Sequence, residues 1–319
     1  MSDQPETEVT VHAGATTGST RAVKAVIPAA GLATRFLPAT KAVPKELLPV
    51  VDRPVLQYIV EEATAAGIRD VLLITGRGKT SMVDHFDRRP DLEARLEEKG
   101  DDARLAAVRG PSELADIFTC RQHEQLGLGH AVGCAQSHVG DEPFAVLLGD
   151  EFVKPSEPLL PAMLELQART GGVVLAFFEV PPAETKRYGI ASVAPTDGEF
   201  ADLGDVVEVT GLVEKPAPEE APSNLAVLGR YVLPGRIFEA IARTEPGAGG
   251  EIQLTDAIAE EIQAGRDVFG LRFRGQRFDC GSKAGFLQAT VAFGLERDEL
   301  KDEFAEYLHE VMSMRRAAE

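Results

Sequence analysis

A loop of small residues near the start of the chain is followed closely by three cations. Residues 26–38 read VIPAAGLATRFLP and lead at once into ATKAVPKELLP, so Arg35, Lys41 and Lys45 come soon after Gly31. Small residues let backbone N–H groups approach phosphate oxygens, and cations balance the charge that moves when a phosphate ester reacts. These residue types and this spacing indicate a triphosphate-binding loop. The alternative is an ordinary strand-to-helix turn with surface cations.

Three later segments carry residue types that could complete a site with this loop. Gln122 leads into GLGHA, which begins at Gly127; Asp150 follows an apolar run; Glu214 and Lys215 lie in the turn VEKP. Each feature alone has an ordinary explanation, because glycines lead into helices, aspartates cap them and charged turns are usually solvated. Together they supply phosphate-facing backbone groups, a carboxylate for a metal ion and a polar pair for a sugar.

The periodicity of apolar residues places two of these features at one edge of a sheet. Residues 23–28 are expected to form a strand, 54–66 a helix that begins at proline, and 71–75 the next strand. This order is a βαβ unit, whose right-handed crossover puts Gly31 at the carboxyl edge of a parallel sheet, where ligands bind. Asp150 follows another buried strand and is expected at the same edge.

After about residue 185 the pattern of predicted elements changes to short strands that are separated by turns. The further expected strands cover residues 116–121, 144–148, 173–180, 190–193, 206–214, 225–233, 268–273 and 276–278. Helical spacing predicts a helix at 252–263 and C-terminal helices between 284 and 314. We therefore predict an α/β fold, with a Rossmann-like, mostly parallel mixed sheet flanked by helices, a smaller antiparallel β lobe and C-terminal helices.

Bulk composition limits the class of protein and its partners. The chain has 319 residues, 44% of them hydrophobic, and a formal net charge of −18. This acidity argues against nucleic acid or an anionic membrane as the main partner. No apolar run approaches the roughly 20 residues of a membrane span and no signal-peptide pattern is present, so we expect a cytoplasmic location. The three cysteines have no metal-like spacing and are expected to be reduced thiols.

At this point the motifs resemble a known family. Over roughly residues 23–293 the sequence is similar to bacterial UTP–glucose-1-phosphate uridylyltransferases, also called UDP-glucose pyrophosphorylases, a branch of the sugar nucleotidyltransferases. The resemblance is carried by GLATRFLPATK, PKELLP, GLGHA, VEKP, PSNLA with GRY, GEIQLTD and DCGSK. It implies that UTP and glucose 1-phosphate are the substrates, that UDP-glucose and pyrophosphate are the products, and that Mg²⁺ assists an in-line attack of the sugar phosphate on the α-phosphorus.

The resemblance also implies roles for single residues on the nucleotide. Ala30 and Gly31 would hold the nucleoside through backbone groups. Gln122 and the backbone of Gly127 would read uracil, since an amide side chain and a close backbone can match the donor and acceptor edge of the base.

Charged residues are implied for catalysis and for the metal. Arg35 would bind the β- and γ-phosphates that leave as pyrophosphate, and Lys45 would lie across the phosphates during the reaction. Lys215 would grip the sugar phosphate. Asp150 would bind Mg²⁺, and Asp279 matches a second carboxylate that related enzymes use for the metal.

The sugar would be bound by the second half of the chain. The resemblance implies that Glu214 accepts hydrogen bonds from glucose hydroxyls, beside Lys215, and that Gly189 makes a backbone contact near the sugar.

Composition, the pattern of predicted elements and the resemblance together suggest a domain organisation. Residues 1–20 are expected to be a disordered tail, and residues 21–283 a nucleotidyltransferase domain. Its nucleotide-binding half would span about 21–184 and its sugar-binding half about 185–283. Helices at 284–319 are a candidate oligomer interface, and the family suggests a homodimer or homotetramer.

The chain departs from the family pattern in two places. Ala33 stands where the commonest loop has a third glycine, which is tolerable if its φ is negative. Gly149 stands where many members have proline, which leaves Asp150 less rigidly placed. His130 lies in GLGHA, and we expect it to pack or to start a helix, because this reaction needs no base at neutral pH.

Other functions are compatible with parts of this pattern. The nearest keeps the chemistry and changes the substrate: a thymidylyltransferase, or a transferase for another hexose 1-phosphate. A non-catalytic nucleotide-sugar-binding subunit is a second alternative, although such a subunit would not need both the leaving-group cations and the metal carboxylate. A nicotinamide-binding dehydrogenase is disfavoured, because GLATR is not the GxGxxG fingerprint.

Overall fold

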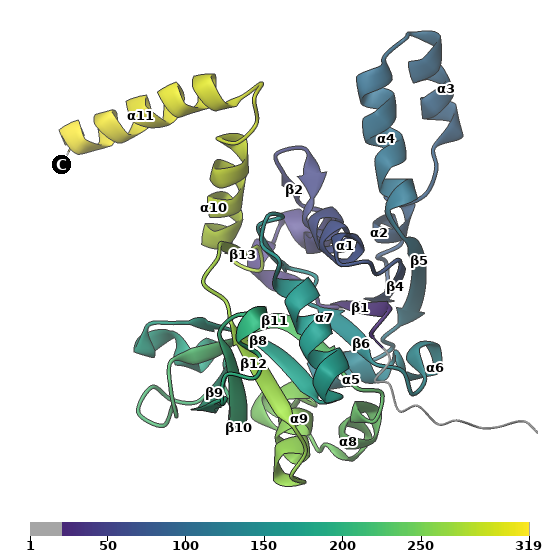
Figure 1. The fold of residues 1–319 in the computed structure, drawn as a ribbon. Coiled ribbons are helices and arrows are strands. Elements are labelled where there is room, and N and C mark those ends of the chain that lie inside the picture. Colours follow the sequence, from purple (N-terminus) through teal and green to yellow (C-terminus); the bar gives the residue numbers. More distant parts are fainter. Residues whose placement is uncertain (1–20, 319) are drawn as a thin grey trace, which may run out of the picture.

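A mixed sheet runs through the middle of the molecule (Figure 1). The structure is a computed structural model that describes residues 21–318, so the tail predicted at residues 1–20 lies outside the described residues. In spatial order, the nine strands that the main sheet has within residues 21–318 are β5 (Asp116–Arg121), β4 (Asp70–Thr75), β1 (Lys24–Ala29), β6 (Phe144–Leu147), β11 (Leu225–Leu233), β8 (Val173–Glu179), β12 (Val268–Arg272), β10 (Val206–Glu214) and β9 (Gly189–Pro195).

Helices and short 3₁₀ turns surround the sheet. The helices of the described region are α1 (Val55–Ala65), α2 (Ser81–Asp84), α3 (Pro90–Glu98), α4 (Asp102–Leu114), α5 (Leu128–Gly133), α6 (Gln136–Val139), α7 (Leu159–Thr170), α8 (Ile237–Arg243), α9 (Leu254–Gln263), α10 (Lys283–Gly294) and α11 (Lys301–Ala318). Helical spacing at 81–100 and the glycine loop at residue 127 predict helices where α2, α3 and α5 lie, whereas no element was predicted for the segments of α4, α7 and α8. Three 3₁₀ turns follow the first strand: η1 (Thr34–Phe36), η2 (Ala39–Lys41) and η3 (Lys45–Leu47).

The predicted βαβ unit is confirmed. β1 and β4 are parallel neighbours, in a register that runs from Lys24 opposite Asp70 to Ala29 opposite Thr75, and α1 lies between them in sequence. β1 also pairs in parallel with β6. The loops that follow β1 and β6 therefore leave the sheet at the same edge, which brings the Gly31 loop towards Asp150.

The other half of the sheet is largely antiparallel. β11 runs antiparallel to both β6 and β8, and β10 runs antiparallel to β12 and β9. The strands that we expected in a smaller antiparallel lobe are thus continuous with the main sheet, because β11 joins them to β6. The mixed α/β class is confirmed, with fewer parallel pairs than expected. Two separate antiparallel pairs complete the β structure of the described region: β7 (Glu151–Val153) with β13 (Arg277–Asp279), and β2 (Pro49–Val50) with β3 (Arg53–Pro54).

Alternating residues of β1 supply the cores on the two faces of the sheet. Ile27 packs with residues of α1 such as Leu56, whereas its neighbour Val26 belongs to the cluster that includes Val132 of α5 and Ile237 of α8. All five side chains are fully buried. This alternation is the period of two expected for a central strand, and it fixes where the loop after β1 begins.

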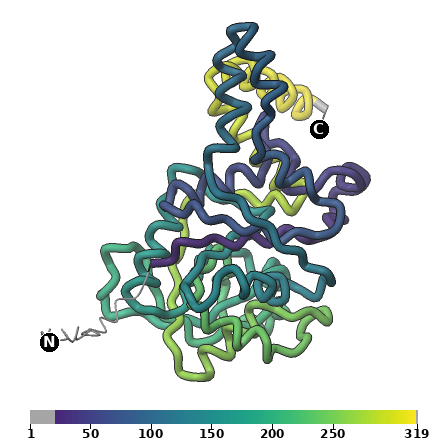
Figure 2. Tube along the Cα trace, turned by 90° about the vertical axis from the view of Figure 1, so that its right-hand side faces the viewer, coloured from purple at the N-terminus to yellow at the C-terminus, as the bar shows by residue number. Residues whose placement is uncertain are grey.

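Two helical segments project from the same end of the molecule. Figures 1 and 2 agree that the α3–α4 hairpin and α11 both extend away from the sheet, with α10 connecting α11 to the body. α11 exposes apolar side chains, with Tyr307 58% and Met314 61% accessible. Among residues 21–318, no helix has both the length and the apolar character that crossing a bilayer requires.

Candidate active site

Two cavities adjoin at the edge of the sheet where β1 and β6 end. The first, of about 310 Å³, lies between the Gly31 loop and the Gly127 loop, and we call it the loop cavity. The second, of about 410 Å³, lies against the ends of β9 and β10, and we call it the strand cavity. The residues that line both cavities are Leu128, Leu148, Asp150 and Glu251.

The structure brings every predicted site residue to one of these cavities. Those that line the loop cavity are Ala30, Gly31, Lys45, Gln122 and Gly127. Those that line the strand cavity are Arg35, Gly189, Glu214, Lys215 and Asp279. Asp150 lines both, so the predicted residues converge on one composite site.

An ion pair lies at the junction of the two cavities. The Lys45 ammonium contacts the Asp150 carboxylate. Burial lowers the pKa of Lys45, but the attraction of Asp150 and their hydrogen bond outweigh burial, so this pKa lies above its ordinary value. Lys45 is therefore a fixed positive charge beside a carboxylate.

A second, deeper ion pair supports the first, and the sequence analysis missed it. Glu46 is fully buried and accepts from Lys79 Nζ at 3.0 Å, while the same nitrogen donates to Ala29 O at 2.6 Å. Burial raises the pKa of Glu46 and lowers that of Lys79. Lys79 follows the carboxyl end of β4, which is a position where a cation could have been noted from the sequence.

The two departures from the family pattern have structural consequences. Ala33 has φ 55° and ψ 37°, so the condition of a negative φ is not met, and this left-handed backbone costs a residue with a β-carbon about 1–2 kcal/mol. The Thr40 hydroxyl donates to Ala33 O at 2.7 Å and holds the turn. A β-carbon on Gly149 would lie 3.0 Å from Pro28 O, so glycine lets the end of β6 pass close to β1. Asp150 is positioned by its ion pair instead.

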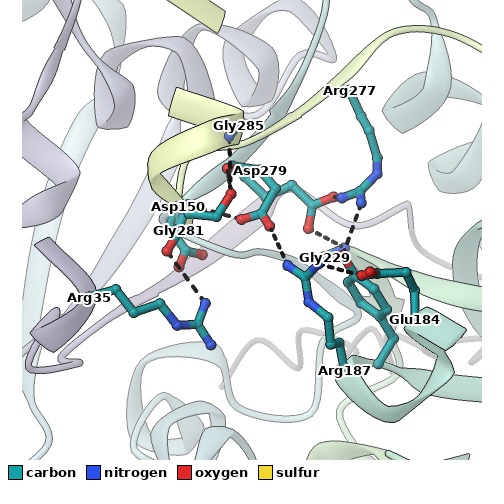
Figure 3. A network of polar contacts seen from close by, with 12 residues as sticks. Arg35, Asp150, Glu184, Arg187, Gly229, Arg277, Asp279, Gly281 and Gly285 are labelled. Carbon is teal, nitrogen blue, oxygen red and sulfur yellow. Dashed lines mark hydrogen bonds and ion pairs between the residues drawn. The ribbon is translucent and has the colours of Figure 1, made fainter. Parts of the chain in front are cut away.

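Two carboxylates approach each other around Gly281 (Figure 3). A β-carbon on Gly281 would lie 2.7 Å from Asp150 Oδ2 and 3.0 Å from Asp279 Oδ1. They meet because β13 pairs with β7, with Asp279 opposite Glu151. Cations lie beside them: Arg187 Nη2 is 3.3 Å from Asp279 Oδ2, and Arg35 Nη1 donates to Gly281 O at 3.4 Å.

Buried charges behind Asp150 hold this segment. Arg230 is completely buried and donates to Glu151 O at 2.8 Å and to Glu62 Oε2 at 2.7 Å. The Glu151 side chain pairs with Arg277, and burial raises the pKa of Glu151 against the attraction of Arg277. Removing one member would leave a buried charge without its partner, so this network fixes the backbone next to Asp150.

The far wall of the strand cavity is built by the β9–β10 pair. Gly189 lies opposite Glu214, and a β-carbon on Gly189 would lie 3.2 Å from Glu214 Oε2 and 2.7 Å from Thr255 Cγ2. Glu214 accepts from the Thr255 hydroxyl at 2.9 Å and pairs with Lys215 at 2.8 Å. Lys215 has φ 50°, a strained backbone for a residue with a side chain. Thr255, which orients Glu214, was not identified from the sequence.

A segment from the second half of the chain supports the Gly127 loop. Ile252 N donates to Leu126 O at 2.7 Å, and Gly129 N donates to Ile252 O at 2.8 Å. A β-carbon on Gly127, where φ is 113°, would lie 2.6 Å from Ile252 O, and one on Gly129 would lie 2.9 Å from the same atom. The glycines of GLGHA are therefore required by the close approach of GEIQLTD.

The amide of Gln122 is held by this loop. Gln122 is 7% exposed, and its Nε2 lies 3.1 Å from Gly127 O and 3.0 Å from His130 Nδ1. Gln125, which the sequence analysis did not single out, donates from Nε2 to Ala30 O at 2.8 Å and joins the Gly127 loop to the Gly31 loop.

Known proteins resemble this chain over nearly its whole length. The nucleotidyl transferase family model matches residues 24–294. The chain is 48% identical to the UTP–glucose-1-phosphate uridylyltransferase of Bacillus subtilis, over 91% of this chain and 97% of that protein. It is also 48% identical to UTP–glucose-1-phosphate uridylyltransferase 2 of Staphylococcus saprophyticus, over 89% of this chain and 96% of that protein.

Solved structures give the same picture. A UTP-bound UGPase from Acinetobacter baumannii has a TM-score of 0.81 at 43% identity and covers 91% of this chain and 99% of its own. A UDP-glucose pyrophosphorylase complexed with UDP-glucose has a TM-score of 0.76 at 38% identity, over 86% and 100% of the two chains. By sequence and by fold, the chain belongs to the nucleotidyl transferase family and, within it, to the bacterial UTP–glucose-1-phosphate uridylyltransferases.

Proposed function

We propose that this protein transfers a uridylyl group from UTP to α-D-glucose 1-phosphate and releases pyrophosphate. The observation that carries the proposal is the position of Asp150, which lines both cavities and contacts Lys45. A nucleotide in the loop cavity and a sugar phosphate in the strand cavity would meet at this carboxylate.

On the nucleotide side, the loop cavity offers groups that fit uracil. Within residues 21–318, Gln122 Oε1 accepts no hydrogen bond from the protein and Gly127 N–H donates none. An acceptor and a donor of this kind complement the N3–H and a carbonyl of uracil. The backbone of Ala30 and Gly31 would face the nucleoside from the opposite side of the same cavity.

The cations divide the phosphates between them. Lys45 would neutralise charge that builds on the leaving pyrophosphate as the bond to the α-phosphorus breaks. Arg35 lines the strand cavity, so it would bind the β- and γ-phosphates from that side of the junction at Asp150. Lys215 would hold the phosphate of the sugar in line with that bond. No covalent intermediate is required, so these residues contribute alignment and charge neutralisation.

On the sugar side, Glu214 would accept hydrogen bonds from glucose hydroxyls, with Gly189 leaving room for the sugar ring. The Thr255 hydroxyl and Lys215 fix the orientation of Glu214. A carboxylate that is already hydrogen-bonded in the right direction loses little entropy when it binds a polyol.

Asp150 and Asp279 would hold a magnesium ion. Within residues 21–318, no group of three or more histidine, cysteine, aspartate or glutamate side chains could hold a metal by itself. Mg²⁺ is usually bound by one or two carboxylates together with waters and substrate phosphates, so a pair of hard oxygen donors fits it. When bound, Mg²⁺ would supply Lewis-acid polarisation of a phosphoryl oxygen. Lys45 and Arg187 would have to give up part of their contact with these carboxylates.

The test is pyrophosphate release from UTP, glucose 1-phosphate and MgCl₂. Pyrophosphate and UDP-glucose should form in equal amounts, and EDTA should stop the reaction. Replacing UTP by dTTP measures how strictly the loop cavity selects the nucleotide, and replacing glucose 1-phosphate by galactose 1-phosphate measures how strictly the strand cavity selects the sugar. Binding of UTP without any turnover would contradict the proposal and favour a regulatory subunit.

The domain division, the oligomer and the location of the protein stay predictions. We infer that residues 21–184 bind mainly the nucleotide, that residues 185–283 bind mainly the sugar, and that 284–319 form an interface in a homodimer or homotetramer. The exposed apolar side chains of α11 support such an interface. Sedimentation of the full chain beside a variant that ends before α11 tests it. The cytoplasmic location rests on the sequence alone.

A further inference from the structure

We propose that His130 is a specificity-determining positioning residue. By accepting a hydrogen bond from Gln122 Nε2, His130 keeps the carbonyl oxygen of Gln122 facing the loop cavity. The site then selects a base that carries a hydrogen on ring nitrogen 3, such as uracil, over cytosine. This inference rests on the proposed role of Gln122 as the residue that reads the base.

The orientation of the Gln122 amide follows from Gly127. Gly127 O lies 3.1 Å from one terminal atom of that amide, and a backbone carbonyl can only accept a hydrogen bond. The atom beside it must therefore be Nε2, which donates. The other terminal atom, Oε1, is left as a hydrogen-bond acceptor without a donor from residues 21–318.

His130 supplies the second anchor of this amide. Its Nδ1 lies 3.0 Å from the same Nε2, so Nδ1 is the unprotonated ring nitrogen and Nε2 of the ring carries the hydrogen. His130 is placed by the first turn of α5, where Ala131 N donates to Gly127 O at 3.1 Å. It lines neither cavity, whereas Gln122 and Gly127 both line the loop cavity. His130 therefore acts through Gln122 and does not touch the base.

The two anchors make the reversed amide unfavourable. If the amide turned over, Oε1 would face both Gly127 O and His130 Nδ1, which are two acceptors. The outward Oε1 suits the N3–H of uracil, but it faces a lone pair on N3 of cytosine, and two acceptors that face each other without a hydrogen oppose binding. Uracil and thymine share the N3–H, so the oriented Gln122 amide distinguishes both from cytosine but does not distinguish them from each other.

Two variants that nearly match each other in shape test the role of the acceptor. In His130→Asn, the Asn Oδ1 takes the place of Nδ1 and can still accept; in His130→Leu, a methyl group takes that place. One hydrogen bond changes an equilibrium about threefold to tenfold, so His130→Leu should raise the KM for UTP and lower the UTP-to-CTP ratio of kcat/KM by that factor. Its kcat with UTP should stay within about twofold, and His130→Asn should keep both KM and the ratio.

A third substitution separates this inference from the proposed function. Gln122→Leu removes the reader itself and should reduce the UTP-to-CTP ratio more than His130→Leu does. If Gln122→Leu leaves the ratio unchanged, Gln122 does not read the base and the proposed role of Gln122 fails. If Gln122→Leu reduces the ratio while His130→Leu does not, the role of His130 alone is wrong. His130→Ala removes the same acceptor without adding bulk, so it replaces His130→Leu if that variant does not fold.

Discussion

The two cavities are built by different physical means. The loop cavity is lined by close backbone, the uncharged amides of Gln122 and Gln125, and few charges. The strand cavity is lined by many ionisable side chains, namely Arg35, Lys186, Arg187, Lys215, Asp150, Glu151, Glu214, Glu251 and Asp279. A neutral heterocycle is recognised by the direction of hydrogen bonds, whereas a sugar phosphate also requires charge. Changes of shape should therefore affect the first cavity most, and changes of charge the second.

The largest effect is expected at the boundary between the cavities. Lys45→Ala removes a preorganised cation beside Asp150, and loss of one such group typically lowers kcat by about 10²–10³-fold. The measurement is steady-state pyrophosphate release at saturating UTP and glucose 1-phosphate. Lys41→Ala, in the neighbouring turn, is the control, because Lys41 is exposed, lines neither cavity, and makes no side-chain hydrogen bond or ion pair within residues 21–318. If Lys45→Ala keeps a nearly normal kcat, Lys45 has no catalytic role.

A charge change confined to the strand cavity should act on the sugar alone. Glu214→Gln keeps the shape but weakens the pairing with Lys215 and with sugar hydroxyls. Hydrogen bonds to charged groups contribute about 1.5–3 kcal/mol, so kcat/KM for glucose 1-phosphate should fall about 10- to 100-fold. The KM for UTP should change little. Glu208→Gln, on the exposed side of β10, is the control and should change neither KM. If Glu214→Gln raises the KM for UTP as much as the KM for glucose 1-phosphate, the division between the cavities is wrong.

A shape change confined to the loop cavity should act on the nucleotide and on stability. In Gly127→Ala the new methyl group would meet Ile252 O at 2.6 Å, at a φ of 113°. We expect unfolding free energy to fall by about 1–3 kcal/mol and the KM for UTP to rise. Urea unfolding and UTP kinetics measure this. Gly110→Ala in α4 is the control: apart from the neighbouring Pro111 its methyl group meets no atom, so it should change the unfolding free energy by less than about 1 kcal/mol and leave the KM for UTP unchanged. If Gly127→Ala is as stable as the native chain, the GLGHA and GEIQLTD segments do not have to pack this closely.

The smallest effect is expected in the Gly31 loop. Ala33→Gly removes the strain of a left-handed alanine, but glycine loses more backbone entropy on folding by roughly 0.5–1 kcal/mol. The two terms oppose each other, so the unfolding free energy should change by less than about 1 kcal/mol. Ala33→Val should be worse than either, because a β-branched residue tolerates this backbone poorly. If Ala33→Val has the stability of the native chain, the loop has rearranged.

Sequence reasoning succeeded where a feature follows from the end of a strand. The βαβ pattern placed Gly31 and Asp150 at one edge because parallel strands carry their loops to the same side. Motif resemblance then brought Gly189, Glu214 and Asp279 to the site, although their meeting depends on the β9–β10 and β7–β13 pairings. Those registers depend on how whole strands align, and no local sequence pattern predicts them.

Other features could not be predicted because they depend on packing between distant segments. The positive φ of Ala33 has no signature in the sequence. The pairing of Glu46 with Lys79 depends on how the segments after β1 and β4 pack together, which the predicted neighbourhood of the two strands does not specify. α8 has seven residues, too few for helical spacing to stand out. α7 was predictable, because its leucines have helical spacing and Gly171 follows its last residue.

The contact between Ile252 and the two glycines of the Gly127 loop has a consequence for recombining relatives. Exchanging residues 126–131 between two members of the family would transfer the glycines without the backbone against which they pack. A chimera with a crossover anywhere between these segments separates two partners that hydrogen-bond at 2.7 and 2.8 Å. The Gly127 loop and residues 251–253 therefore have to be exchanged together if a chimera is to keep this packing.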